Sequence, residues 1–198
     1  MFGSFGLSGQ LRPKLLGRRP ERVGLWWKLR NFRNVWRGLW RVWLARLLGL
    51  ATMHGELRAR LFRADGRIVD YGLVSTRVVT TAFVNFMVDQ LQVDTTEWGD
   101  FKFHDSGVGI TAEAIGDIDI ETTDAEARAT GSQTESAANA YRSVGTIAYT
   151  TTKAITEHGL FSKSTGTTLL DRSVFSAINV VNGDSIEFTY TLTCTAGS

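Results

Sequence analysis

Alternating apolar and polar residues dominate the C-terminal third of the chain. Between residues 185 and 193 the apolar side chains share one parity: Ile186, Phe188, Tyr190 and Leu192. A period of two predicts a strand with one buried face and one wet face. Asn182 and Gly183 precede it and suit a tight turn. Residues 169–181 are apolar with one change of parity, so we expect a long, bulged strand that forms a hairpin with the last strand.

Shorter alternating runs occur earlier in the chain. Residues 56–62 and 67–74 are separated by Asp65 and Gly66, which predicts a hairpin. Its first strand would bury three residues of one parity, Leu57, Ala59 and Leu61. Further strands are predicted at 101–104, 126–135, 141–152 and 154–161; the second of them suits a sheet edge or an arm paired with another subunit. The stretch 107–124 is rich in Gly, Thr and acidic residues and predicts a long surface loop.

Apolar residues at three- and four-residue steps predict two helices. The first spans about 21–49, with a stripe made of Leu25, Leu29, Phe32, Trp36, Leu39, Trp43 and Leu47. The second spans about 80–91, where a threonine can cap the N-terminus and Phe83, Phe86, Met87 and Leu91 form the buried stripe. The expected fold is mainly β: an antiparallel β-sandwich or jelly roll with one packed helix, preceded by a basic amphipathic N-terminal helix or arm.

Charge divides the chain into two parts. Residues 1–52 hold 11 of the 22 Lys and Arg residues and one acid, a net charge of +10, whereas residues 53–198 carry −8. Five of the six tryptophans also lie in the first part. We therefore expect a Trp/Arg-rich arm at 1–52, flexible over residues 1–20, and a β-sandwich domain at 53–198.

The tryptophans of the arm need a surface to cover them, because each buries roughly 150–250 Å² when packed. The predicted partner-binding residues are Trp26, Trp27, Arg30, Arg33, Trp36, Arg37, Trp40, Arg41 and Trp43. The surface could be the domain itself, a neighbouring subunit, an anionic membrane or nucleic acid. The arginines exclude a membrane span between 26 and 50. Alternatively, residues 1–52 are a dispensable extension, since Met53 looks like a natural start.

The C-terminal part resembles a segment of tailed-bacteriophage virion proteins, which are described as tail-fibre-like, minor structural or capsid-associated. The resemblance covers about 101–195, and is carried by Ile-Thr-Glu-His-Gly-Leu-Phe-Ser at 155–162, a Gly-Thr turn at 166–167, Leu-Leu-Asp-Arg-Ser-Val-Phe at 169–175 and Gly-Asp-Ser-Ile-Glu-Phe-Thr-Tyr-Thr-Leu at 183–192. It implies a phage structural protein and brings no catalytic motif.

Reactive residues occur without the patterns that catalysis needs. His104, Asp105 and Ser106 are adjacent, whereas a catalytic triad joins residues that are distant in sequence. The acids at 117, 119, 121 and 124 lack the spacing of a calcium loop, and the three histidines are too scattered for a metal set. The single Cys194 excludes an internal disulfide and has the parity of a buried residue. We expect no enzyme, cofactor or metal.

These patterns favour a non-enzymatic virion protein that decorates or cements the capsid. Its partners would be the major capsid protein or other virion proteins and further copies of itself, as a trimer or higher oligomer. It would reside in the virion after assembly in the host cytoplasm. Two alternatives remain open. The first is a tail, neck or fibre component that contacts a receptor through the 107–124 loop, with Trp98 nearby. The second is a membrane- or nucleic-acid-binding protein that acts through residues 21–49, with packaged DNA as one target.

Overall fold

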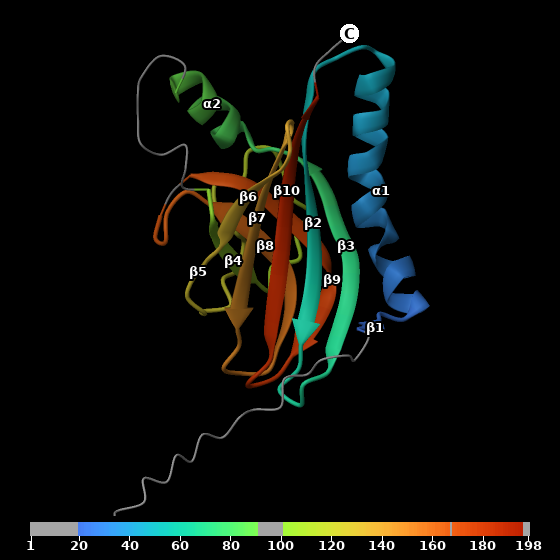
Figure 1. Ribbon diagram of the computed structural model, residues 1–198, viewed down its shortest axis with the longest axis vertical. Helices are drawn as coiled ribbons and strands as arrows, with labels where there is room; N and C mark the ends of the chain where they lie inside the picture. Colours follow the sequence, from blue (N-terminus) through green and yellow to red (C-terminus); the bar gives the residue numbers. More distant parts are fainter. Residues whose placement is uncertain (1–19, 91–100, 167, 196–198) are drawn as a thin grey trace, which may run out of the picture.

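Two β-sheets stack into a sandwich with a helix along one side (Figure 1). The computed structural model describes residues 20–90, 101–166 and 168–195. The elements are β1 (Glu21–Arg22), α1 (Leu25–Leu47), β2 (Thr52–Phe62), β3 (Ile68–Val78), α2 (Thr81–Gln90), β4 (Phe103–Gly107), β5 (Ala129–Thr130), β6 (Ser132–Ala137), β7 (Ala140–Ala148), β8 (Lys153–Phe161), β9 (Leu169–Val180) and β10 (Ser185–Thr195). The larger sheet has the order β1-β3-β2-β10-β7-β6, and the smaller one β5-β4-β8-β9. The predicted mainly β sandwich is confirmed.

The β2–β3 hairpin forms as its sequence predicts. Gly66 adopts a φ of 83° in the turn, a conformation that favours glycine. Leu57, Ala59 and Leu61 all point into the core and are at most 1% exposed. Both strands continue beyond the predicted limits, because β2 begins at Thr52 and β3 ends at Val78.

The predicted hairpin between the last two strands is wrong. β10 pairs with β2 and β7, whereas β9 pairs with β8 in the other sheet. The turn at Gly183 (φ 87°) therefore carries the chain from one sheet to the other. Asp184 holds this corner, because its carboxylate accepts hydrogen bonds from Arg63 (2.7 Å) and from the backbone N–H of Ala64 (2.9 Å).

Other local predictions along the strands are confirmed. The register of β9 against β8 shifts at two places, as expected for a bulged strand. The strand predicted at 126–135 divides into β5 and β6, and β6 forms one edge of the larger sheet with all six residues exposed. Residues 108–128 form the expected long loop, in which the only pairing of the described residues is the bridge between Gly107 and Thr123.

The second helix is α2, and it caps one end of the sandwich (Figure 1). The hydroxyl of Thr80 accepts a hydrogen bond from the backbone N–H of Phe83 (3.2 Å), which is the predicted N-cap. Phe83 and Phe86 pack edge-on against Phe101, with ring centroids 5.1 and 5.0 Å apart. Leu91 and Trp98, like residues 1–19 of the arm predicted at 1–52, lie outside the described residues.

Cys194 corrects one prediction of burial. It shares the parity of Leu192 but is exposed. The reason is its place near the end of β10, beyond the last residue that pairs with β7, where the sheet no longer covers it. Alternation therefore predicts the direction of this side chain correctly and its environment incorrectly.

Candidate functional site

The helix α1 docks on the sandwich through a polar residue. The amide of buried Asn31 donates to the carbonyl of Val74 in β3 (2.7 Å) and accepts from the backbone N–H of Ser176 in β9 (2.9 Å). β9 is the last strand of the smaller sheet, and next to β3 in the larger one lies only the two-residue β1. Asn31 thus satisfies backbone groups on an open edge of each sheet, which would otherwise need water or another strand.

Two further residues of α1 fix the docking. The indole of Trp27 donates to the carbonyl of Ala177 (3.0 Å), and its ring meets Tyr71 edge-on, with centroids 4.9 Å apart. Gly38 is buried directly against the backbone of Thr76, so a Cβ at this position would overlap the Thr76 carbonyl. The helix therefore packs through a narrow strip that contains polar and very small residues.

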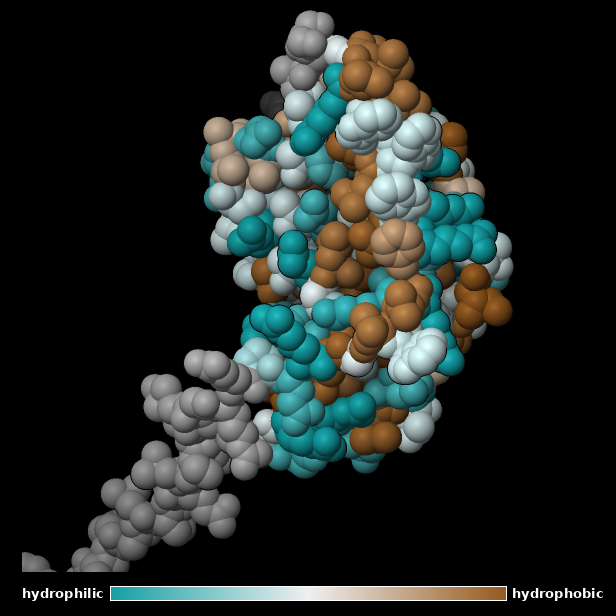
Figure 2. Space-filling model, turned by 90° about the vertical axis from the view of Figure 1, so that its right-hand side faces the viewer, coloured by the Kyte–Doolittle hydropathy of each residue, from teal (hydrophilic) through white to brown (hydrophobic). Residues whose placement is uncertain are grey.

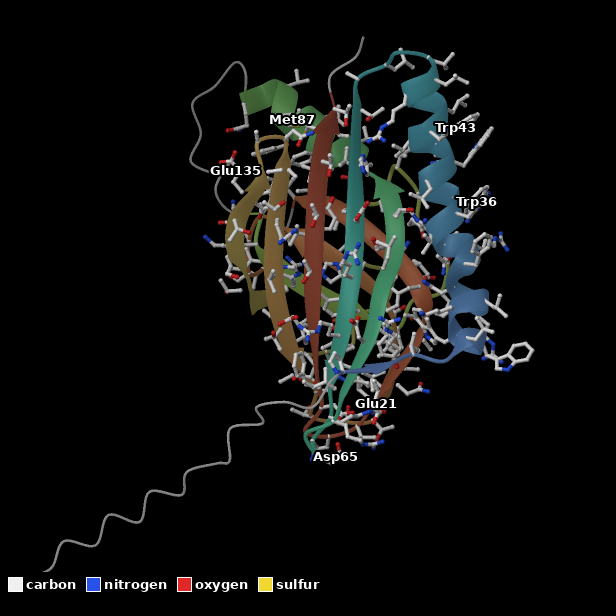
Figure 3. The ribbon with its side chains drawn as sticks, turned by 45° about the vertical axis from the view of Figure 1, so that its right-hand side comes forward. Glu21, Trp36, Trp43, Asp65, Met87 and Glu135 are labelled. Carbon is white, nitrogen blue, oxygen red and sulfur yellow. The ribbon has the colours of Figure 1, made fainter. Side chains whose placement is uncertain are left out.

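The opposite face of α1 is apolar and exposed. We call it the outer face; its ten residues are between 37% and 80% exposed: Leu25, Trp26, Leu29, Phe32, Trp36, Leu39, Trp40, Trp43, Leu44 and Leu47. Figure 2 shows it as a band of brown and near-white side chains along the helix. Trp36 and Trp43 point away from the sandwich in Figure 3. Of the surfaces considered from the sequence, the domain itself is therefore not the one that covers this stripe.

Stacked aromatic rings give the outer face a defined shape, with a groove beside them. Phe32 stacks on Trp36 and Trp40 stacks on Trp43, with centroids 5.7 and 5.6 Å apart. A groove of about 540 Å³ runs beside these rings, lined by Trp36, Leu39, Trp40, Val42, Trp43 and Arg46. An exposed apolar surface of this extent marks a place where a soluble protein meets a partner or a membrane.

Basic residues border the outer face. At 100° per residue, Arg30, Arg33, Arg37 and Arg41 form one row along α1, and Lys28 and Arg46 lie on the other side. All six are exposed. Of the nine residues predicted to bind a partner, eight are therefore exposed on this surface or its basic border. Trp27 is the exception, because it faces the sandwich.

The adjacent His104, Asp105 and Ser106 have three different sets of partners. Asp105 pairs with Arg128 (2.9 Å). The hydroxyl of Ser106 contacts Asp124 and lies 3.1 Å from the Tyr149 hydroxyl. His104 points between the sheets.

Sequence reasoning missed a buried histidine pair. Nδ1 of His104 lies 2.9 Å from Nε2 of His158, and Nε2 of His104 lies 2.8 Å from the hydroxyl of Ser143. Both imidazoles are fully buried, and His158 also packs on Phe188. Burial lowers the pKa of His104 to about 3 and that of His158 well below its ordinary value, an effect that His104 reinforces. The pair is thus neutral, and it joins β4, β8 and β7 across the two sheets.

A second polar cluster anchors the 108–128 loop. Glu157 is fully buried and accepts hydrogen bonds from the backbone N–H groups of Gly109, Glu121 and Thr122 (2.9, 3.0 and 2.8 Å). It also pairs with Arg172 (2.8 Å). Two of the acids considered above for a calcium loop serve this cluster, since Asp117 and Glu121 pair with Arg172 as well.

Within the described ranges, no group of three or more His, Cys, Asp or Glu side chains is placed to hold a metal ion. In the same ranges neither helix combines the length and apolarity that crossing a bilayer requires. No family model, curated protein or solved structure shows a significant match to the chain.

Proposed function

We propose that this chain is a non-enzymatic structural protein of a tailed-phage particle, which adheres to a neighbouring virion subunit through the outer face of α1. The observation that carries the proposal is that α1 is docked by buried hydrogen bonds while its aromatic stripe faces outward. A helix that only needed to cover its own sheets would turn its tryptophans inward.

The size of the surface suits a stable protein contact. Four exposed tryptophans, each able to bury roughly 150–250 Å², supply a large part of the ~800 Å² that one partner buries in a standard interface. The five leucines and one phenylalanine of the outer face extend the area. Trp and Arg are also the residues most enriched at interaction hot spots, and both are concentrated here.

The likeness of residues 101–195 to phage virion proteins supports a place on the particle, and capsid decoration or cementing is the favoured role. The major capsid protein is then the first partner. A trimer or higher oligomer would align several outer faces, and the exposed edge strand β6 offers backbone groups for contacts between copies.

One experiment tests this role directly. The double variant Trp36→Ser/Trp43→Ser keeps its fold, because both side chains are exposed, but is expected to lose most of its incorporation into purified phage particles. Incorporation is measured by quantitative mass spectrometry of the particles, with melting of the purified protein as a check on folding. Val181→Ser removes an exposed apolar side chain from the β9–β10 turn and serves as the control. Normal incorporation of the double variant contradicts the proposal.

The same variants distinguish this role from a second candidate function, adhesion to an anionic membrane. Its specific support is the basic border on both sides of the outer face, the pattern of helices that lie in a lipid interface. In that case the wild-type chain binds phosphatidylglycerol vesicles but not phosphatidylcholine vesicles, and salt weakens binding steeply. Vesicle binding that depends on Trp36 and Trp43, together with normal particle incorporation, favours the membrane.

A tail or fibre location has support from the 108–128 loop. Three of its four isoleucines, Ile110, Ile115 and Ile118, are 78%, 60% and 73% exposed. Exposed apolar side chains on an anchored loop suit contact with a receptor. If the protein were found on the tail of the particle, with the outer face of α1 uncovered, a tail or fibre location would be favoured over the capsid.

A further inference from the structure

A cavity of about 310 Å³ lies where α1 meets the end of β3, the middle of the smaller sheet's edge strand β9 and the 108–128 loop. Its volume is roughly ten times the ~30 Å³ that one water occupies in the liquid, so it can hold a group of several non-hydrogen atoms. Arginines from three elements line it: Arg37 and Arg41 of α1, Arg77 of β3 and Arg172 of β9.

Positive charge in this cavity exceeds the negative charge that lines it. The carboxylates of Glu157, Asp117 and Glu121 already neutralise Arg172. Among the described lining residues, Glu113 is the one carboxylate that faces the other three arginines. No ion pair of the described residues involves Arg37 or Arg41, and α1 itself contains no acid.

Arg77 supplies a buried donor. Its side chain is 6% exposed and forms an ion pair with Glu113, while one terminal nitrogen donates to the carbonyls of Asn34 and Thr76. Its Nη2 is buried and has no hydrogen-bond partner in the described part of the chain. Burial lowers the pKa of Arg77 to about 10; the charge of the buried Asp171 opposes this, and the charges of Arg37 and Arg41 reinforce it. An unpaired guanidinium donor beside two further guanidinium groups is the donor set of an oxyanion site.

We propose that this cavity binds a phosphate-type oxyanion, held by Arg37 and Arg41 and by the free Nη2 of Arg77. The anion bridges α1 to β3 and relieves the repulsion between the three guanidinium groups. It therefore fastens the helix that carries the outer face. This site is independent of the partner that the outer face binds.

Titration calorimetry of the full chain with inorganic phosphate and with pyrophosphate tests the site. We expect saturable one-to-one binding, with pyrophosphate tighter because it fills more of the cavity. Arg37→Ala/Arg41→Ala is expected to weaken binding by about a hundredfold, or about tenfold for each charge-assisted contact. Both side chains are exposed, so the variant folds. Arg37→Lys/Arg41→Lys keeps the charge but not the planar fork, and is expected to bind with intermediate affinity.

Arg30→Ala is the matched control, because Arg30 lies in the same basic row but does not line the cavity. It is expected to bind phosphate like the wild type. Slower amide hydrogen exchange in α1 when phosphate is present would support the bridging role. The proposal is overturned if the wild type shows no saturable binding at millimolar phosphate. It is equally overturned if Arg30→Ala weakens binding as much as the cavity variant, which is the behaviour of diffuse attraction to a basic surface.

Discussion

Asn31 is the residue on which the packing of α1 depends. Its side chain hydrogen-bonds to backbone atoms of both β3 and β9. An amide is suited to this position because it carries a donor and an acceptor in one plane, so it can satisfy a carbonyl on one strand and an N–H on the other. A charged or apolar residue of similar size could satisfy at most one of them.

We expect Asn31→Ala to reduce the free energy of unfolding by about 2–4 kcal/mol, since it leaves a buried carbonyl and a buried N–H without partners. Urea denaturation followed by tryptophan fluorescence measures this change. Arg30→Ala, one position earlier and exposed, is expected to change stability by less than about 0.5 kcal/mol. Equal effects of the two substitutions would show that α1 is not held by these hydrogen bonds.

Asn31 also shows why sequence could predict the helix but not its orientation. The spacing of Leu25, Phe32 and Trp36 identifies a helical stripe, and amphipathicity normally places such a stripe against the core. Here the open sheet edges need hydrogen bonds, so Asn31 and Gly38 face inward instead. Whether a helix covers a sheet face or a sheet edge depends on tertiary pairing, which the local pattern does not contain.

At the scale of elements, α1 is the cover for two strand edges. β3 and β9 run beside it in Figure 1, and uncovered edges of that length invite pairing with other chains. The close approach of α1 to β3 is possible because Gly38 has no side chain. Glycine is otherwise a poor residue for the middle of a helix, at a cost of about 1 kcal/mol relative to alanine.

Gly38→Ala therefore tests the docking of α1, because the substitution is expected to stabilise a free helix but to destabilise a docked one. In a free helix the substitution would stabilise α1 by about 1 kcal/mol. In the docked helix we expect it to lower the melting temperature and to speed amide exchange in α1, because the new Cβ collides with the backbone of Thr76. Gly24→Ala, where a Cβ meets nothing within 4 Å, is the control. A rise in melting temperature would refute the docking.

The strands show where the local sequence is enough to predict the structure and where it is not. The β2–β3 hairpin follows from Asp65 and Gly66, because the turn joins two runs of matching length. Asn182 and Gly183 carry the same signal, yet they connect two sheets. A tight turn reverses the chain in both cases. Whether the two strands then pair with each other or join different sheets depends on distant contacts, here the pairing of β10 with β2, more than 120 residues away. The pattern of buried positions in β10 was nevertheless predictable.

At the scale of the whole molecule, the histidine pair joins the two layers. His104 and His158 meet because β4 pairs with β8 and β7 lies opposite, and none of these registers can be derived from the spacing of histidines in the sequence. The tautomers that leave no buried N–H unpaired place a proton on Nε2 of each ring: His158 donates to His104, and His104 donates to Ser143. Neither ring can accept a further proton without a buried charge.

This pair should make the fold acid-sensitive. In the unfolded chain each histidine has a pKa near 6.5 and binds a proton below it, whereas the folded pKa values are lowered. Stability is therefore complete above about pH 6.5 and is lost as the pH falls toward about 3. Burial raises the pKa of Asp171 to about 6 and also raises that of Asp105, which opposes this loss of stability, whereas the lowered pKa of His54 adds to it.

We expect the free energy of unfolding to fall by about 2–3 kcal/mol between pH 7 and pH 5, measured from urea midpoints. This window lies above the range in which the carboxylates of ordinary or lowered pKa titrate. His158→Met removes one titrating ring beside Phe188 and is expected to remove more than half of this fall, because Asp171 offsets much of what the remaining histidine contributes. His54→Gln should change the slope less, because Glu56 partly offsets the effect of burial on the pKa of His54. A flat profile in the wild type would rule out the neutral buried pair.

The anchoring of the 108–128 loop at Glu157 has a consequence for how this surface can change. The segment between residues 109 and 122 is held at both its ends by the buried carboxylate of Glu157, while Ile110 and Ile118 within it are exposed to solvent. Ile110 and Ile118 can therefore be replaced without disturbing this anchor, unlike Glu113 and Ile115, which line the arginine cavity. New side chains at these two positions alter what the molecule presents to its surroundings and leave the two sheets as they were.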